Sequence, residues 1–195
     1  MLFRSGLGHT AATAEEARRA LSGGVTSFTH LYNAMPALHH REGGAVCVAL
    51  TEDQAWVELI ADGLHICPDM IALAWHCKPH DRFVLITDSM EATGCADGEY
   101  AIAGQKVIVK NGRAETLDGA LAGSTLDLWQ GVQNLMKFAK VPLELAVACA
   151  TMNPAEMLGI DREVGSIDKG KRADLLLIDQ DMKICGVYAK GCPVG

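Results

Sequence analysis

The chain has 195 residues, enough for one substantial domain or for one domain with a small appendage. It is 49% hydrophobic and 21% charged, with a formal net charge of −7; this acidic balance argues against a nucleic-acid partner, which leaves a basic footprint. No apolar run is long enough to span a membrane, and the first residues, MLFRSGLG, are too short and too polar for a secretory signal.

Seven cysteines are scattered through the chain, and no two of them form a CxxC spacing. Free cysteines behave as small hydrophobic side chains, and disulfides are rare in reducing compartments. The sequence therefore predicts reduced and mostly buried thiols in a cytoplasmic protein.

The first half of the chain alternates between helix-like and strand-like segments. Thr13, with Glu16 three residues later, has the pattern of a capping box, which predicts a helix that ends at Gly23. Strands are predicted at VTSF (25–28), VCVAL (46–50) and RFVLITDSM (82–90), and a helix at PDMIALAWHCKP (68–79). Continuous apolar strands that alternate with helices indicate a parallel sheet that is buried on both faces.

The second half begins with short alternating strands in residues 99–117, where Asn111–Gly112 is a strong signal for a hairpin turn. A helix capped by Ser124 or Thr125 is predicted next, followed by two short helices. From residue 163 onward the chain is rich in strands and turns, and ADLLLID is the clearest strand.

Four polar residues lie at or just after the end of a strand-like segment: His9, His30, His65 and Asp88. Each is about one βα unit from the next, and in a β/α barrel the carboxyl ends of the strands meet at the face that carries the active site. These residues would therefore share one pocket. Two neutral imidazoles with one or two carboxylates are a usual donor set for a catalytic divalent metal, and both zinc and iron suit it.

Each of these residues also has a purely structural interpretation. A lone histidine after a strand more often makes a structural hydrogen bond than binds a metal, and the Thr-Asp pair at Asp88 could simply cap a helix. His39 and His40 are interpreted as parts of a solvated loop. The shared placement of the four residues, rather than any one of them, favours a metal site.

Several motifs resemble the C-terminal half of the N-acetylglucosamine-6-phosphate deacetylase family, within the amidohydrolase superfamily. The matching stretches are GHTAAT, THLYNAMP with HREGG, ADGLHI, LITDSM, LAGST, and NPAEMLGI with GSIDKGKRADLLLID. The last stretch is shared widely among amidohydrolases. By contrast, THLYNAM, ADGLH and TDSM together are specific to the deacetylases.

The resemblance implies a role for each matching residue. His9 and His30 would bind the catalytic divalent metal, and Asp88 would act as the catalytic acid/base. Arg41 would contact the sugar phosphate, and in the family this residue can reach across a dimer interface. The other implied substrate-binding residues are Asn33 and Ala34, then Asp62, Gly63, Leu64 and His65, then the lid residues Ala122, Gly123 and Ser124. The implied reaction hydrolyses the N-acetyl group of N-acetylglucosamine 6-phosphate, which yields glucosamine 6-phosphate and acetate.

The expected fold is α/β: the C-terminal half of a (β/α)₈ barrel in residues 1–160, with part of a small β-sandwich in residues 161–195. A complete barrel needs about 200–250 residues. The family's early strands, its metal-binding Glu and a further His are therefore expected upstream of residue 1. Half a barrel exposes two strand edges, so the isolated chain is expected to be inactive or weakly stable unless another chain supplies the missing half.

Three functions remain open from the sequence. The first is a metal-dependent deacetylase or its C-terminal portion, homodimeric in the full-length form. The second is another amidohydrolase deacylase or a deaminase, which would generally lack the sugar-phosphate set of Asn33, Arg41 and His65. The third is a truncated, non-catalytic fragment. The sequence does not distinguish glucosamine from galactosamine phosphates.

Overall fold

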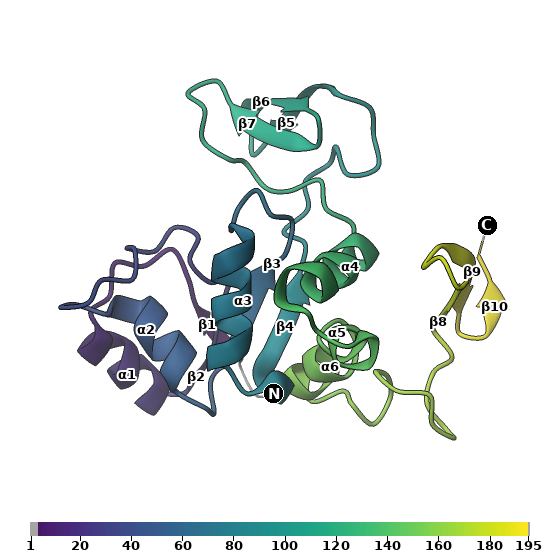
Figure 1. The fold of residues 1–195 in the computed structure, drawn as a ribbon, viewed down its shortest axis with the longest axis horizontal. Coiled ribbons are helices and arrows are strands. Elements are labelled where there is room, and N and C mark those ends of the chain that lie inside the picture. Colours follow the sequence, from purple (N-terminus) through teal and green to yellow (C-terminus); the bar gives the residue numbers. More distant parts are fainter. Residues whose placement is uncertain (1–3, 195) are drawn as a thin grey trace.

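A parallel sheet covered by helices forms the body of the protein in a computed structural model, which describes residues 4–194 (Figure 1). Its strands are β1 (Ser5–Leu7), β2 (Val25–Phe28), β3 (Trp56–Ile60) and β4 (Phe83–Ile86). They are hydrogen-bonded in the order β1-β2-β3-β4, and each neighbouring pair is parallel. This order confirms the predicted α/β fold, because four successive parallel strands are half of those in a (β/α)₈ barrel.

Helices connect the strands and cover one face of the sheet (Figure 1). They are α1 (Ala14–Ser22), α2 (Gly44–Thr51), α3 (Pro68–Cys77), the 3₁₀ turn η1 (His80–Arg82), α4 (Leu128–Ala139), α5 (Leu143–Ala148) and α6 (Met152–Leu158). The predicted capping box of α1 is confirmed, since Thr13 and Glu16 each accept the other's backbone N–H. Within residues 4–194, no helix is both long and apolar enough to cross a membrane.

The apolar core lies between this sheet and its helices. Phe28, Leu59 and Phe83 of the strands are completely buried against Ile71 of α3 and Leu135 of α4. Burial of apolar surface contributes roughly 25 cal/mol per Å², so this layer holds the strands in register. It thereby fixes where the loops at their carboxyl ends begin.

A three-stranded antiparallel ribbon is inserted between β4 and α4. Its strands are β5 (Gly98–Ile102), β6 (Gln105–Lys110) and β7 (Arg113–Thr116). The predicted hairpin turn is confirmed, since Asn111 and Gly112 join β6 to β7 with positive φ angles of 53° and 73°. Val107 and Val109 form a small separate core with Met90. The ribbon stands beyond the carboxyl edge of the parallel sheet, at the top of Figure 1.

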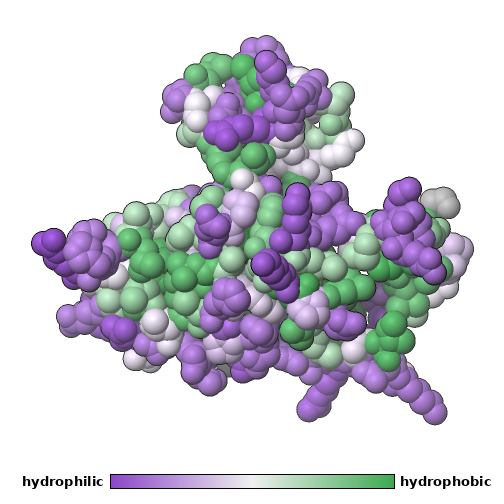
Figure 2. Space-filling model, in the orientation of Figure 1, coloured by the Kyte–Doolittle hydropathy of each residue, from purple (hydrophilic) through white to green (hydrophobic). Residues whose placement is uncertain are grey.

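The C-terminal segment forms a second antiparallel sheet, with β8 (Leu175–Ile178), β9 (Ile184–Ala189) and β10 (Cys192–Pro193) in the order β10-β9-β8. Large apolar side chains remain on its surface: Leu176 and Leu177 are each 50% exposed and Ile184 is 46% exposed. Figure 2 shows apolar surface in this part of the molecule, on the right. A second sheet would cover such a face, as the predicted β-sandwich requires. The predicted boundary between the two domains at residue 160 stays a prediction.

Two local predictions of secondary structure are wrong. Residues 46–50 lie in helix α2 rather than in a strand. A short apolar run does not distinguish a buried strand from a buried helix, and here packing against α1 and α3 decides. Helix α4 is capped by Asp127, whose carboxylate accepts the Gln130 N–H at 2.8 Å, and not by Ser124 or Thr125.

The prediction of mostly buried cysteines is also wrong. Cys149 is buried and Cys47 is half-buried, whereas the other cysteines are exposed. Two of the exposed thiols lie at the ends of α3 and two in the open sheet of β9 and β10. The average burial of free cysteine does not hold at such positions, because helix ends and open sheet faces lie at the surface.

Candidate active site

Four candidate residues occupy the same position relative to their strands. His9, His30, Asp62 and Asp88 each lie two residues beyond the last residue of β1, β2, β3 and β4, respectively. Because the strands are parallel and adjacent, their carboxyl ends lie along one edge of the sheet. The four side chains therefore belong to loops that leave this edge together. The sequence pattern predicted this position for His9, His30 and Asp88, but it named His65 in place of Asp62, and His65 lies five residues beyond the end of β3.

Three of these residues have an unusual backbone conformation. The φ angles of His9, His30 and Asp88 are 45°, 32° and 49°. Residues other than glycine rarely adopt this left-handed region, and each such residue costs on the order of 1–3 kcal/mol. The three residues thus share one backbone conformation as well as one position, although other non-glycine residues, such as Asn111 and Lys140, also adopt positive φ in turns of this structure.

His9 and His30 come into direct contact. Their ring centroids are 4.7 Å apart and the ring planes are at 77°. His30 is only 8% exposed, and among residues 4–194 its Nδ1 has no hydrogen-bond partner. Glycine is required at position 8 beside this pair, because a Cβ there would collide with the Thr29 side chain.

This pair fits a divalent metal. A buried ring nitrogen without a partner normally costs free energy, and metal coordination by a neutral imidazole would satisfy it. Within residues 4–194, however, no three His, Cys, Asp or Glu side chains are grouped closely enough to bind a metal ion. Neighbouring strands are about 4.8 Å apart, so β4, which Asp88 follows, lies about 10 Å from β2, which His30 follows. Asp88 thus lies at the same edge of the sheet as His9 and His30 but is not grouped with them as a metal ligand.

The segment predicted as a lid is bound to the loop that carries Asp88. The Ser124 N–H donates to the Asp88 carbonyl oxygen at 2.8 Å, and the Met90 N–H donates to the Ser124 carbonyl oxygen at 2.9 Å. The Ser124 hydroxyl donates to the Thr87 carbonyl oxygen. Ser124 and Ala122 are buried, at 3% and 8% exposure. Ser124 therefore anchors Gly123 beside Asp88, and contact of this segment with substrate stays a prediction.

Asp62, Gly63, Leu64 and His65 form a tight turn after β3. One carboxylate oxygen of Asp62 accepts the backbone N–H groups of Leu64 and His65 at 2.8 and 2.9 Å. The other contacts His65 Nδ1 at 2.6 Å. Burial raises the pKa of Asp62, but the hydrogen bonds from His65 and Leu64 outweigh burial and hold that pKa below its ordinary value. Asp62 is therefore an ionised carboxylate at neutral pH.

The remaining predicted substrate residues lie between β2 and α2. The Asn33 side-chain amide donates to the carbonyl oxygens of His30 and Leu31, at 3.2 and 3.3 Å. Ala34 is exposed. Arg41 is exposed in the loop predicted to be solvated, and its Nε donates to His40 Nε2 at 2.9 Å. This segment extends to the edge of the molecule, on the left of Figure 1.

One polar residue near the imidazole pair was not identified from the sequence. Glu58 lies in the middle of β3, and its carboxylate accepts the Thr29 hydroxyl at 2.9 Å. Its backbone carbonyl accepts the Leu31 N–H at 2.8 Å. Both partners are neighbours of His30 in the chain, so Glu58 supports the loop that presents this imidazole. The available signal was a charged residue inside the apolar strand WVELI.

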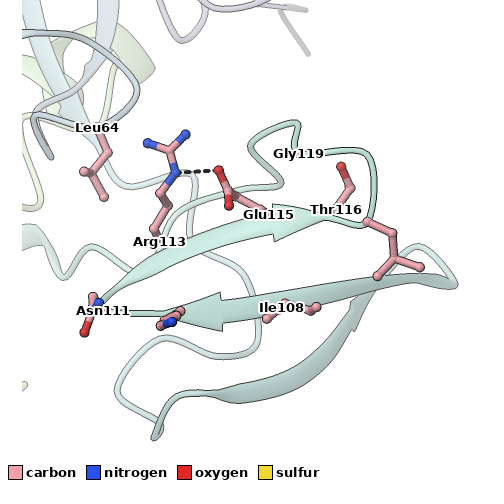
Figure 3. Close-up of a pocket in the computed structure, with 9 residues that line it drawn as sticks. Leu64, Ile108, Asn111, Arg113, Glu115, Thr116 and Gly119 are labelled. Carbon is pink, nitrogen blue, oxygen red and sulfur yellow. Dashed lines mark hydrogen bonds and ion pairs between the residues drawn. The ribbon is translucent and has the colours of Figure 1, made fainter.

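An open hollow of about 570 Å³ lies between the turn after β3 and the ribbon (Figure 3). Leu64 faces β6 and β7 across it, and Arg113 forms an ion pair of 2.6 Å with Glu115 on its wall. Its lining does not include His9, His30 or Asp88. The candidate site is therefore placed at the two imidazoles, which are possible metal ligands, and not at the hollow.

Comparisons with known proteins place the chain in a family. The model of the amidohydrolase family matches residues 5–194. N-acetylgalactosamine-6-phosphate deacetylase from an Escherichia coli O157 strain is 41% identical over 185 residues, which cover 95% of this chain and 49% of that protein. N-acetylglucosamine-6-phosphate deacetylase from Vibrio furnissii is 42% identical over 185 residues, covering 95% and 46%. The chain thus spans about half the length of these curated relatives. A shorter relative from another Escherichia coli strain is 41% identical, and there the match covers 83% of this chain and 96% of that protein.

The fold agrees with a solved structure as well. A mutant N-acetyl-D-glucosamine-6-phosphate deacetylase from Mycobacterium smegmatis, in complex with N-acetyl-D-glucosamine-6-phosphate, superposes with a TM-score of 0.92 at 36% identity. The match covers 97% of this chain and 51% of that one. The chain folds as half of a barrel with polar residues after each strand, and it matches the family model along nearly all of its length. This chain therefore belongs to the amidohydrolase family.

Proposed function

We propose that this chain is part of a metal-dependent deacetylase of amino-sugar phosphates. The reaction is hydrolysis of the N-acetyl group of N-acetylglucosamine 6-phosphate, which yields glucosamine 6-phosphate and acetate in amino-sugar catabolism. The observation that carries the proposal is the contact between His9 and His30 at strained strand ends, with the His30 Nδ1 buried and, within residues 4–194, without a partner. The names of the relatives and the bound sugar phosphate in the Mycobacterium smegmatis structure support it.

His9 and His30 would hold the divalent cation, for which zinc and iron are the candidates. A cation in this position supplies Lewis acidity that makes water more acidic and polarises the acetamide carbonyl. Asp88 leaves the same sheet edge and is exposed. As the general base it would accept the proton of the attacking water, and as the general acid it would then return that proton to the departing amine. The hydrogen bond from Ser124 to the Asp88 carbonyl oxygen would keep this loop in place.

The sugar phosphate would be bound by residues of neighbouring loops. The guanidinium group of Arg41 matches phosphate oxygens through its planar fork. Asn33 with Ala34 and the turn after β3 would contact the sugar, and His65 of that turn would lie near the phosphate. Arg41 lies on an exposed loop at the edge of the molecule, which supports a homodimer of the full-length form in which it reaches the partner's site. The free thiols of all seven cysteines support a reducing compartment such as the cytoplasm.

Three alternatives to this function are distinguished by the test below. The relative from the Escherichia coli O157 strain is named for N-acetylgalactosamine 6-phosphate, which differs from the glucosamine substrate only at one hydroxyl centre. A non-catalytic role is the second alternative, and turnover by a chain that holds both halves decides it. Another amidohydrolase deacylase would not depend on the phosphate group.

The test has a binding arm and a turnover arm. The full chain is titrated with Zn²⁺ and Fe²⁺, then with N-acetylglucosamine 6-phosphate, N-acetylgalactosamine 6-phosphate and unphosphorylated N-acetylglucosamine. A chimera in which residues 5–194 replace the matching half of the Vibrio furnissii enzyme is assayed for acetate release from the same sugars. We expect metal binding that requires His9 and His30, and turnover that requires the phosphate. Equal turnover of the unphosphorylated sugar would favour another deacylase, and a folded chimera without turnover would favour the non-catalytic fragment.

A further inference from the structure

In the turn after β3, the Asp62 carboxylate makes all of its hydrogen bonds to groups of the same turn. Asp62 accepts the N–H groups of Leu64 and His65 with one oxygen and contacts His65 Nδ1 with the other. The side chains of Asp62 and His65 are only 7% and 8% exposed. Gly63 permits the turn through its positive φ of 77°, and the Phe138 ring would lie 3.2 Å from any Cβ at that position. Both oxygens of the carboxylate are thus occupied by groups of its own turn, whereas His65 uses only Nδ1 in this contact; Asp62 is therefore the less suited of the two to contact a substrate.

The contact with Nδ1 determines where the imidazole carries its proton. An ionised carboxylate can only accept hydrogen bonds, and the low pKa of Asp62 keeps it ionised. At 2.6 Å, His65 Nδ1 must therefore be the donor. Nε2 is left as the ring nitrogen available to a ligand, and it carries a hydrogen only when the ring is an imidazolium.

We propose that Asp62 is a positioning residue that acts through His65 and does not itself contact the sugar phosphate. Its carboxylate fixes the orientation of the ring and holds a hydrogen on Nδ1, so that Nε2 alone meets the ligand. This inference rests on the proposed function, in which His65 lies near a phosphate monoester. A phosphate requires a donor, so His65 binds it from Nε2–H as an imidazolium whose charge Asp62 balances. The charge-assisted hydrogen bond formed in this way is stronger than one from a neutral ring.

The alternative is that Asp62 only closes the turn. Asp62→Asn separates the two roles, because the amide oxygen can still accept both backbone N–H groups. The amide nitrogen then faces Nδ1 and can only donate, so the neutral ring must move its hydrogen to Nε2. The variant therefore keeps the turn and reverses the tautomer. Asp69→Asn, in the first turn of α3 and exposed, is the matched control.

The first measurement needs no substrate. Ring ¹⁵N shifts of the full chain, labelled at histidine and assigned with His65→Gln, are recorded at about pH 8.5, where an ordinary imidazole is neutral. We expect the Nδ1–H tautomer of His65 in the wild type and in Asp69→Asn, and the Nε2–H tautomer in Asp62→Asn. The backbone amide signals of Leu64 and His65 report whether the turn is intact. An Nε2–H tautomer in the wild type, or an unchanged tautomer in Asp62→Asn with the turn intact, would overturn the proposal.

The second measurement uses binding. We expect Asp62→Asn to weaken the binding of N-acetylglucosamine 6-phosphate by about tenfold, since a hydrogen bond from a neutral ring to the phosphate replaces one from an imidazolium. Binding of unphosphorylated N-acetylglucosamine should not change. An equal loss for both sugars would contradict a role at the phosphate. If the wild type binds neither sugar, the proposed function fails, whereas the positioning of the ring by Asp62 is still decided by the tautomer.

Discussion

Replacing His30 with leucine tests whether this imidazole is present for a ligand or for folding. The side chain is 8% exposed and, among residues 4–194, its Nδ1 has no partner. A buried polar atom without a hydrogen bond costs about 1–3 kcal/mol. Leucine has a similar size and no polar atom to satisfy. Without metal, His30→Leu is therefore expected to be more stable than the wild type by up to about 3 kcal/mol, less the cost of leucine at a φ of 32°, which histidine tolerates better.

Metal is expected to reverse this order. A ligand that binds only the folded chain stabilises it by about 2.7 kcal/mol at a concentration of 100 times its Kd, and His30→Leu should lose that gain. The assay is urea unfolding followed by circular dichroism, in EDTA and in excess Zn²⁺. His76→Leu is the matched control, because His76 is exposed on α3, and it should retain the stabilisation by metal.

Two outcomes would refute this reasoning. A His30→Leu chain that is less stable than the wild type in EDTA, by more than about 1 kcal/mol, would mean that the imidazole serves the fold. Stabilisation by Zn²⁺ that is equal in the variant and the wild type would mean that His30 is not a ligand.

Three further changes have distinct expected results. Asp88→Asn in the chimera should lower the turnover number by about 10²–10⁴ with unchanged stabilisation by metal, and normal turnover would exclude Asp88 as the acid/base. Burial lowers the pKa of Lys78 from its ordinary 10.5 to about 8, so between these values the unfolded chain binds more protons than the folded one. The free energy of unfolding should then rise with pH across this window, by at most about 3 kcal/mol, and Lys78→Met should remove that rise in urea titrations at several pH values. The Asn153 amide donates to two backbone carbonyls near the start of β4, both at 2.7 Å; Asn153→Ala should cost about 2–4 kcal/mol in the same assay, and a loss below about 1 kcal/mol would contradict this role.

Local features were predictable because they depend on residues a few positions apart. The capping box of Thr13 and Glu16 and the hairpin turn at Asn111–Gly112 are confirmed for that reason. The predicted strand at 46–50 is wrong because its apolar pattern fits either conformation, and the neighbouring helices select the helix. The exposure of most cysteines likewise follows from where their elements lie in the fold.

The sequence by itself determined that His9, His30 and Asp88 stand just beyond strand ends, since a polar residue after an apolar strand is a local signal; after β3 it pointed to His65, whereas Asp62 holds the equivalent position. It did not show that the rings of His9 and His30 touch, that Nδ1 of His30 is buried without a partner in residues 4–194, or that Asp62 holds His65. Only the tertiary structure decided these points. The contact of His9 with His30 depends on the pairing of β1 with β2, which are separated by a helix in the chain, and no local pattern encodes the distance between side chains on paired strands.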